Sequence, residues 1–368
     1  MTQNRKIELG SFCFVLIMMA FFAISYVGIF SIYDEYCIYL VTAVLLYCLL
    51  RMHCSPFDIV LILFTAIYHV ISKLVNGGGI GSILTYFCGL FFLIVFSRAL
   101  FTEVHKKVLK IVSCIAVLAL AVLSLLYIES YWLLYRSSSF LNPNTYCVFM
   151  LYAYIIYMCL SDKLFTPGNL ILTAVTIFAT FNYRSRAMAV AVIMFCIMQL
   201  LGPKWRTKGR MLTLSLILVV VGLAIPFVYL FLYEQDVSAT IMGKSLFTGR
   251  ELLWQNMLDA FEGDFVKQMF GLGSNVDLGK ETLNIHNNMF VVIVNFGFIG
   301  FVLYIAALIH YILKACKNVD NPVCYKWFSM FVCTMLILGM SETVSFWAPD
   351  MVFAYMGLGL ACQKPKEG

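Results

Sequence analysis

The stretch HNNMFVVIVNFGFIGFVLYIAALIH, residues 286–310, decides the fold of this chain. It opens with a histidine and two asparagines and continues as an apolar segment of roughly 20 residues, the length with which an α-helix crosses a bilayer. Apolar runs of similar character recur throughout the 368 residues. The stretch therefore predicts one membrane-spanning helix among many, with polar residues at its start.

The composition of the whole chain indicates the same class. Hydrophobic residues make up 62% of the chain and charged residues 12%, and the mean hydropathy is +0.92, whereas soluble domains average about 25% charged residues. We expect an all-α polytopic membrane protein that forms a single domain, residues 1–368, with about 12 transmembrane helices. The predicted spans are residues 12–30, 36–50, 57–74, 82–97, 108–128, 144–160, 169–182, 187–201, 211–233, 287–313, 327–342 and 347–361.

The basic residues predict the orientation, because cytoplasmic loops carry an excess of Lys and Arg. With the N-terminus inside, the inner segments hold 17 of the 25 basic residues, and residues 234–286 form one long outer segment between spans nine and ten. We predict cytoplasmic termini and a periplasmic or extracellular loop at 234–286. The net charge of +6 then reflects inner loops at anionic lipid and implies no nucleic-acid partner. Four basic residues remain in short outer loops: Lys73, Arg136, Arg184 and Arg186.

The long outer segment carries a helix signal of its own. Thr248-Gly249-Arg250-Glu251 matches a capping box, with Thr248 expected to cap the helix and Glu251 to reach back. A short amphipathic helix should follow, end at Gly263 and lie along the membrane interface. The turn-rich run FGLGSN, residues 270–275, then predicts a return towards the membrane. The apolar positions of the expected helix, at helical spacing, are Leu253, Met257, Leu258 and Phe261.

Positive charge on the outer side favours an anionic ligand. Arg184 and Arg186 share the tight connection between spans seven and eight, and Arg250 stands in the first turn of the loop helix. Guanidinium groups bind phosphate oxygens in a planar, often bidentate way, and a helix N-terminus also favours anions. Together these arginines suit a pyrophosphate, although any one of them also fits a snorkelling or solvated side chain. Arg136 is a further candidate, in a connection whose aromatic residues also fit the interfacial belt.

His286 is the candidate for chemistry. A neutral imidazole at the membrane surface can accept a proton from a hydroxyl near neutral pH, and the alternative is a histidine that merely caps a helix end. Asn287 beside it is a further substrate-binding candidate. Gly297 and Gly300 should let a neighbouring helix approach the span closely. The 13 cysteines include no CxxC pair, so no metal site is indicated.

These features together resemble the superfamily of bacterial O-antigen ligases and Wzy-type O-antigen or capsular polysaccharide polymerases. The resemblance covers roughly residues 140–313. The motifs that carry it are Ser185-Arg186, Thr248-Gly249-Arg250 with Trp254, Phe270-Gly271-Leu272-Gly273, and His286-Asn287 with Gly297 and Gly300.

This resemblance implies a fold like that of the C-type glycosyltransferases, in the inner membrane of a bacterium. The implied enzyme uses a glycan on undecaprenyl pyrophosphate as donor, at the outer face, without metal or other cofactor. Arg186 and Arg250 would hold the pyrophosphate, and His286 would deprotonate the acceptor hydroxyl. Arg184 is added to the pyrophosphate site by its position alone.

The expected activity is that of a polymerase, which transfers the growing glycan onto an incoming lipid-linked repeat unit of O-antigen, capsule or exopolysaccharide. This preference rests on the short chain rich in Phe, Tyr and Cys and on Asn142-Pro143-Asn144. It implies a separate chain-length regulator protein as a partner. The alternative within the superfamily is an O-antigen ligase, which transfers the glycan to the lipid A core.

Two other classes are compatible with a chain of this kind. A lipid-linked oligosaccharide transporter or flippase should place ionisable residues near the midplane, whereas the candidates here cluster at the outer rim. His69 is the clearest polar residue deep in a span, and we interpret it as a packing residue. Asp58, Glu342 and His310 are expected to reach water at span ends. A structural or regulatory subunit would leave the outer arginines without a role.

Overall fold

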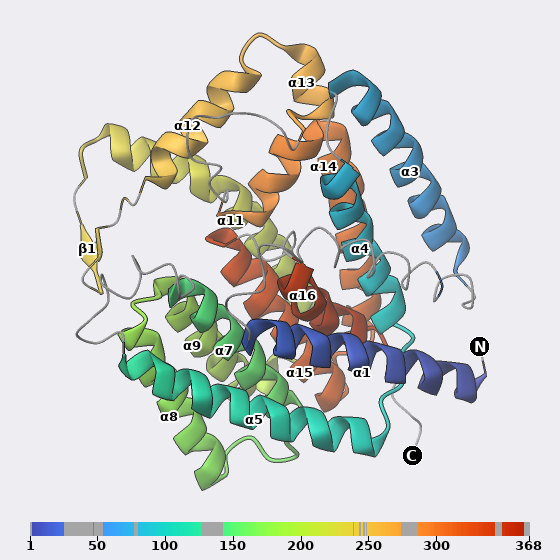
Figure 1. Ribbon diagram of the computed structural model, residues 1–368, viewed down its shortest axis with the longest axis vertical. Coiled ribbons are helices and arrows are strands. Elements are labelled where there is room, and N and C mark those ends of the chain that lie inside the picture. The colour runs from blue at the N-terminus through green and yellow to red at the C-terminus, as the bar shows by residue number, and fades with distance from the viewer. Residues whose placement is uncertain are drawn as a thin grey trace.

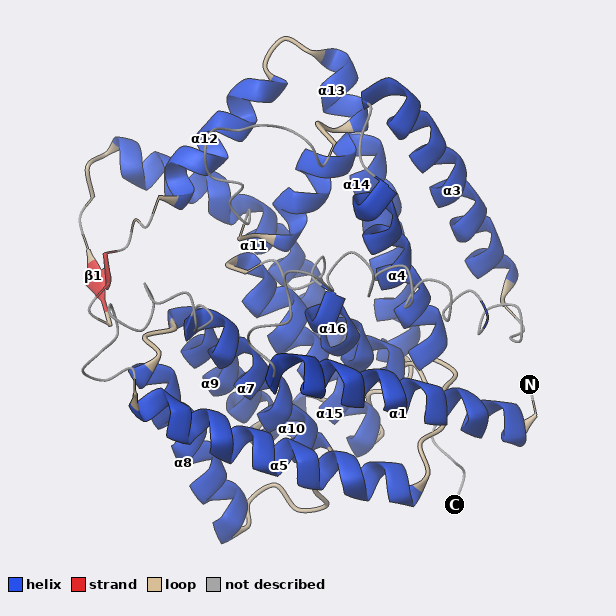
Figure 2. Ribbon diagram, in the orientation of Figure 1, coloured by secondary structure: helices blue, strands red, loops and turns tan. Residues whose placement is uncertain are grey.

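The computed structural model describes residues 2–25, 47, 54–76, 80–126, 143–237, 239–242, 244–245, 247, 249–273, 286–342 and 348–363. These residues form a helical bundle with a smaller outer extension, and the described part of the chain has only one pair of strands (Figure 1, Figure 2). The helices are α1 (Gln3–Ser25), α3 (Pro56–Asn76), α4 (Ile80–Phe96), α5 (Glu103–Leu125), α7 (Pro143–Cys159), α8 (Pro167–Asn182), α9 (Arg186–Leu200), α10 (Gly202–Trp205), α11 (Lys208–Glu234), α12 (Arg250–Phe261), α13 (Phe265–Phe270), α14 (Asn288–Cys316), α15 (Pro322–Phe331) and α16 (Ala348–Ala361). After α15 the chain continues as a π-helix, η1 (Val332–Ile337), and a 3₁₀ turn, η2 (Leu338–Met340).

The long apolar helices confirm an all-α membrane protein. Within the described ranges, five segments are long and apolar enough to cross a membrane, namely Pro56–Val75, Glu103–Leu125, Lys208–Glu234, Asn288–Cys316 and Pro322–Met340. The other predicted spans coincide with shorter helices or with α1, except residues 36–50, which lie almost wholly outside the described residues. The number of crossings therefore stays a prediction.

Local sequence signals explain where several helices begin. Thr102 caps α5 by accepting from the His105 amide, and the His105 ring reaches back to the Thr102 amide. Thr166 caps α8 in the same way, and Asn321 caps α15. Each of these two caps is followed by a proline in the first turn, where the missing N–H costs no helix bond.

The core lies around α7, α15 and α16, and nearly the whole of α7 is buried. In Figure 1, α1 and α5 cross in front of this core, while α11, α12, α13 and α14 extend from it towards the top of the view. His69 belongs to the packed interior, because its ring is 1% exposed and contacts the rings of Phe87 and Phe296. This position agrees with a packing role.

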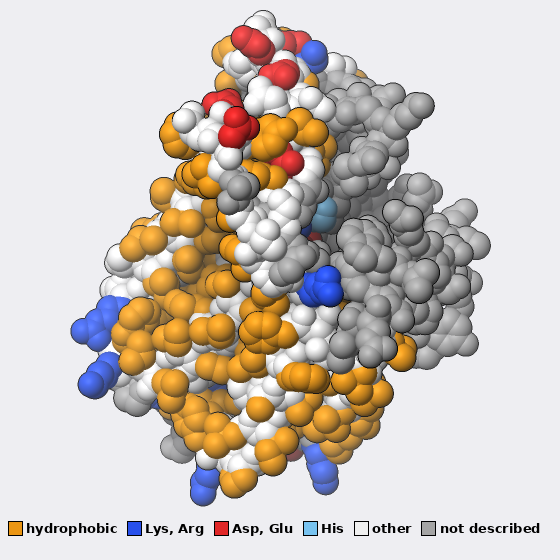
Figure 3. Space-filling model, turned by 90° about the vertical axis from the view of Figure 1, so that its left-hand side faces the viewer, with side chains coloured by type: hydrophobic (Ala, Val, Ile, Leu, Met, Phe, Trp, Pro, Cys, Tyr) orange, Lys and Arg blue, Asp and Glu red, His pale blue; other side chains and the backbone are white. Residues whose placement is uncertain are grey.

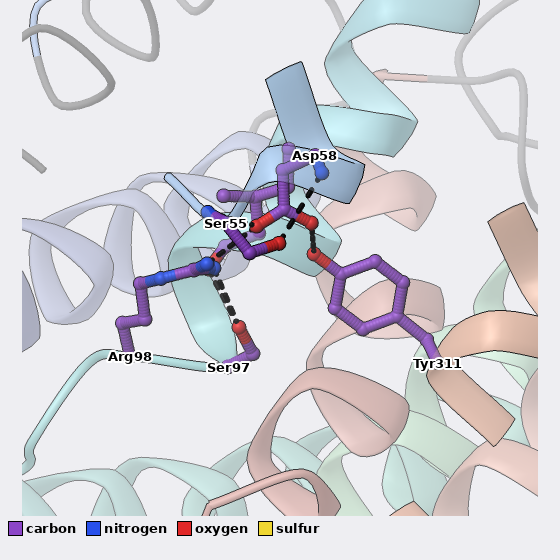
Figure 4. A network of polar contacts seen from close by, with 6 residues as sticks. Ser55, Asp58, Ser97, Arg98 and Tyr311 are labelled. Carbon is purple, nitrogen blue, oxygen red and sulfur yellow. Dashed lines mark hydrogen bonds and ion pairs between the residues drawn. The ribbon is translucent and has the colours of Figure 1, made fainter. Parts of the chain in front are cut away.

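A buried ion pair joins α3, α4 and α14 near the C-terminal end of α14. Asp58 was expected to reach water, but it is only 1% exposed. Its carboxylate accepts from Arg98 at 2.5 Å, from the Tyr311 hydroxyl at 2.8 Å and from the Ser55 amide at 3.0 Å (Figure 4). The expectation was wrong because a buried carboxylate is tolerated where a counter-charge and hydrogen bonds satisfy it. His310, also placed at a span end, stacks on Phe57 and stays partly exposed.

The long segment between α11 and α14 is structured, as predicted. It contains the antiparallel strands β1 (Thr240–Ile241) and β2 (Lys244–Ser245), which the sequence did not indicate, followed by α12 and α13. Figure 3 shows acidic side chains at the α12–α13 end of the molecule, above a broad surface of hydrophobic side chains. The exposed acidic residues there include Asp259 and Glu262.

The N-cap of helix α12 differs from the prediction, and its apolar face packs against other helices. Its cap is Gly249, in the left-handed conformation with φ 90°, and Thr248 lies outside the described residues. Glu251 does reach back, but it accepts from the Gly249 amide, at 2.9 Å, whereas the predicted capping box uses the Thr248 amide. The apolar face packs on α11 and α14, and the position of α12 along a membrane interface stays a prediction. The cluster consists of Leu230, Leu253, Trp254, Met257, Phe261, Leu272, Phe290 and Val294.

Candidate functional site

His286 stands immediately before α14 in a constrained turn. Its φ is +53°, a left-handed conformation that residues other than glycine seldom adopt. The next residue, Asn287, caps α14 by accepting from the Phe290 amide at 2.9 Å. Non-glycine residues in such conformations cluster at functional sites, where the surrounding structure holds them in place. The imidazole is thus fixed at the helix start, as the sequence predicted.

Three segments that are distant in the sequence bring Arg250, His286 and Glu342 together. His286 Nδ1 lies 2.9 Å from Glu342 Oε2, and Arg250 Nη2 donates to Glu342 Oε1 at 3.1 Å. Arg250 Nη2 is also 3.4 Å from His286 Nδ1. The side chains of Arg250, His286 and Glu342 are 21%, 21% and 13% exposed. The two residues that sequence reasoning singled out, His286 and Arg250, therefore share one carboxylate.

The hydrogen-bond pattern defines the protonation of this cluster. An ionised carboxylate oxygen only accepts hydrogen bonds, so His286 Nδ1 is the donor in its contact with Glu342. Burial raises the pKa of the Glu342 carboxyl, but the His286 hydrogen bond and the Arg250 charge together outweigh burial and hold this pKa below its usual value. Glu342 is therefore ionised at neutral pH.

Glu342 is the residue that sequence reasoning missed. It was expected to reach water at a span end, and that expectation was wrong, because its carboxylate is largely buried and bound to two partners. The apolar segment Pro322–Met340 ends two residues earlier. The predicted topology could have pointed to Glu342, because predicted span eleven runs outward and places Glu342 on the same face of the membrane as His286.

Arg186 is the first residue of α9 and carries an unsatisfied donor. Among the residues that the structure describes, its buried Nη1 has no hydrogen-bond partner. The charges of Arg186 and Arg250 both act on the Tyr229 hydroxyl of α11. A buried cationic donor without a partner is costly, and an anion would satisfy it.

The remaining candidates have different surroundings. Arg184 lies in the turn between α8 and α9, with φ +52°. Arg136 lies outside the described residues. Asn287 is 0% exposed, and its amide nitrogen donates to the Gly222 carbonyl at 2.9 Å and the Met340 carbonyl at 3.1 Å. Its side chain is therefore engaged with the main chain in this structure.

Two glycines allow the segment between α12 and α14 to contact α14 closely. Gly297 interrupts the helix with φ +61°, and Gly271 has φ +83°. A Cβ on Gly297 would lie 2.4 Å from the Gly271 amide nitrogen, and the Leu272 amide donates to the Val294 carbonyl at 2.7 Å. The close approach predicted at Gly297 is confirmed, and its partner is the segment after α13 rather than another long helix.

Gly300 and α3 extend this contact. A Cβ on Gly300 would lie 3.0 Å from the Tyr68 ring, so the predicted approach of a neighbouring helix is confirmed. The Tyr68 hydroxyl donates to the Phe296 carbonyl, and the Ser72 hydroxyl donates to the Phe270 carbonyl at 3.1 Å. Helix α3 thereby hydrogen-bonds to α14 on one side of the glycine contact and to the end of α13 on the other.

Comparison with known families agrees with this geometry. Residues 168–305 match the family model described as O-antigen ligase. This match supports the resemblance of the chain to the O-antigen ligase and Wzy-type superfamily. The matched segment includes Arg186, Arg250, His286 and Gly297, whereas Glu342 lies beyond it. A search of curated proteins found no match to the chain.

Proposed function

We propose that the protein is a polysaccharide polymerase that transfers a growing glycan from undecaprenyl pyrophosphate onto an incoming lipid-linked repeat unit. The family implies work on lipid-linked glycans in a membrane. The observation that carries the proposal is the contact of His286 with Glu342 and Arg250. Arg186 supports it, because its buried Nη1 has no hydrogen-bond partner among the described residues. We place this site, with residues 234–286, at the outer face of a bacterial inner membrane, and both termini in the cytoplasm.

In this proposal His286 is the general base. A hydroxyl oxygen of the acceptor sugar attacks the anomeric carbon of the donor, and its proton moves to Nε2. The bond between the anomeric carbon and the pyrophosphate oxygen breaks, and the pyrophosphate leaves with the electron pair. Glu342 acts as a positioning residue, because it holds the ring by Nδ1 and stabilises the imidazolium that forms.

The arginines stabilise the charge that develops on the leaving group. Arg250 uses only Nη2 in its hydrogen bond within the described residues, so the guanidinium keeps further donors for phosphate oxygens. Arg186 contributes the second guanidinium, and Arg184 and Arg136 are further candidates from the sequence. Fixed donors in a partly dry site are worth more than donors in water, and this scheme needs no metal ion.

Purified protein in liposomes tests the activity directly. With the undecaprenyl-pyrophosphate-linked repeat unit as the sole substrate, a polymerase produces a ladder of longer lipid-linked chains. No ladder, but transfer when lipid A core is added, would favour the ligase alternative. If neither product forms and the labelled lipid-linked unit crosses the bilayer, the protein is a transporter or flippase. Co-purification with a chain-length regulator protein would test the proposed partner.

A further inference from the structure

Helix α11 contains a main-chain carbonyl that its own helix cannot satisfy. Pro226 lies inside α11 and has no N–H, so the Gly222 carbonyl four residues earlier lacks its ordinary helical donor. The Asn287 amide nitrogen donates to this carbonyl at 2.9 Å. A proline in one helix thus creates the acceptor for the residue next to His286.

A second irregular helix supplies the other acceptors. After α15, the chain passes through the π-helix η1 and the 3₁₀ turn η2 before it reaches Glu342. Such changes of helix type leave carbonyls without their usual partners and are frequent at functional sites. Asn287 donates to the Met340 carbonyl at 3.1 Å, and Asn288 to the Met335 carbonyl at 3.4 Å.

We propose that Asn287 is a positioning residue for the proposed base, and this inference rests on the proposed function. Its Oδ1 accepts from the Phe290 amide and its Nδ2 bridges Gly222 and Met340, so the whole side-chain amide is used. Because His286 precedes Asn287 and Glu342 follows Met340 by two residues, this bridge fixes the imidazole relative to the carboxylate. Asn287 therefore acts through the main chain of three helices and does not contact substrate.

Asn287→Ser should remove the bridge to Gly222 and Met340 while it keeps the cap on α14. Serine is a good N-cap and can still accept from the Phe290 amide, but its hydroxyl is too short to bridge Gly222 and Met340. We expect kcat in the liposome assay to fall about 10- to 100-fold with a smaller change in donor KM, because a displacement of the base costs rate more than binding. A wild-type kcat would overturn the proposal.

Non-additivity distinguishes positioning from a general loss of structure. In a Glu342→Gln background the imidazole has already lost its carboxylate, so Asn287→Ser should reduce kcat by less than about threefold further. A full additional loss would show that Asn287 acts independently of the His286–Glu342 contact and would overturn the proposal.

Pro226→Ala tests the same bridge from α11 and decides the question if Asn287→Ser fails to fold. The substitution introduces a main-chain N–H that would donate to the Gly222 carbonyl and compete with Asn287. We expect kcat to fall about tenfold, without further loss on combining Pro226→Ala with Asn287→Ser. An unchanged kcat in Pro226→Ala would count against the bridge.

Asn321→Ser is the matched control, because Asn321 caps α15 by accepting from the Val323 and Cys324 amides. It should leave kcat unchanged, and a comparable fall there would attribute the Asn287→Ser result to lost capping. Failure of the proposed function would give a different result from failure of the Asn287 proposal. The wild type would then form no ladder, or His286→Ala would still form one.

Discussion

Glu342 and His286, 56 residues apart in the sequence, are in hydrogen-bond contact, with 2.9 Å between Oε2 and Nδ1. The contact fixes the ring orientation and the tautomer of His286 together. In a carboxylate–imidazole pair the acid supports the base without taking its proton. Glu342 is therefore the residue whose substitution most directly tests how His286 works.

Glu342→Gln should lower kcat by about 100-fold, because a neutral amide cannot stabilise the imidazolium and can present the wrong hydrogen-bonding atom to Nδ1. Glu342→Asp should restore part of the loss where the shorter side chain still reaches the ring. Initial rates of chain extension in liposomes measure both. Glu262→Gln, at an exposed acid just after α12, is the control and should behave as the wild type. Equal rates for Glu342→Gln and the wild type would remove Glu342 from the mechanism.

The same carboxylate predicts a pH-dependent stability. The pKa of Glu342 is lower in the folded protein than in the unfolded chain, so its contacts stabilise the fold above the unfolded value of about 4.3. This contribution is lost as pH falls through the lower folded pKa. The unfolding temperature of the wild type in detergent should therefore exceed that of Glu342→Gln at pH 7, and the gap should close in acid. A gap independent of pH would argue against an ionised Glu342.

The surroundings of Arg186 predict that its replacement weakens donor binding without lowering the stability of the protein. Arg186→Ala removes a buried donor without a partner among the described residues, so the unfolding temperature of the ligand-free protein should stay equal or rise. The KM for the lipid-linked donor should increase about tenfold. Arg186→Lys should restore activity only in part, because a point charge does not reproduce the guanidinium fork. Arg5→Ala, on an exposed part of α1, is the control. Full activity in Arg186→Lys would contradict bidentate binding.

The glycine contact predicts a large effect from one methyl group. Gly297→Ala places a Cβ 2.4 Å from the Gly271 amide nitrogen in a residue with φ +61°. We expect a loss of about 1–3 kcal/mol in the free energy of unfolding, and reduced activity, because the outer segment must shift. Gly209→Ala is the matched control in α11, where a new Cβ meets nothing within 4 Å. Equal stability of the two variants would show that the close approach is dispensable.

The sequence predicted the helices well, because each apolar run must bury its main chain in a helix to lie in a membrane. It also predicted His286 at a helix start and Arg250 in the first turn of the loop helix, since both depend on local patterns. The packing of the apolar face of α12 on α11 and α14 was not predicted, because an amphipathic pattern does not distinguish lipid from a packed protein surface. The side-chain periodicity is the same in either case.

The rest of the site depends on contacts between distant segments. Glu342 looked like a solvated span end, and only the packing of η2 against the start of α14 reveals its partners. The role of Asn287 depends on Pro226, which lies far earlier in the chain, in α11, and exposes the Gly222 carbonyl. No local pattern in the sequence links an asparagine to a proline in another helix.

The most direct test of the central claim compares the wild type with His286→Ala in liposomes that contain only the undecaprenyl-pyrophosphate-linked repeat unit, with both proteins shown to be folded and inserted. We predict that the wild type forms a ladder of longer lipid-linked chains and that His286→Ala forms none. Wild-type-like polymer from His286→Ala would contradict the assignment of His286 as the base.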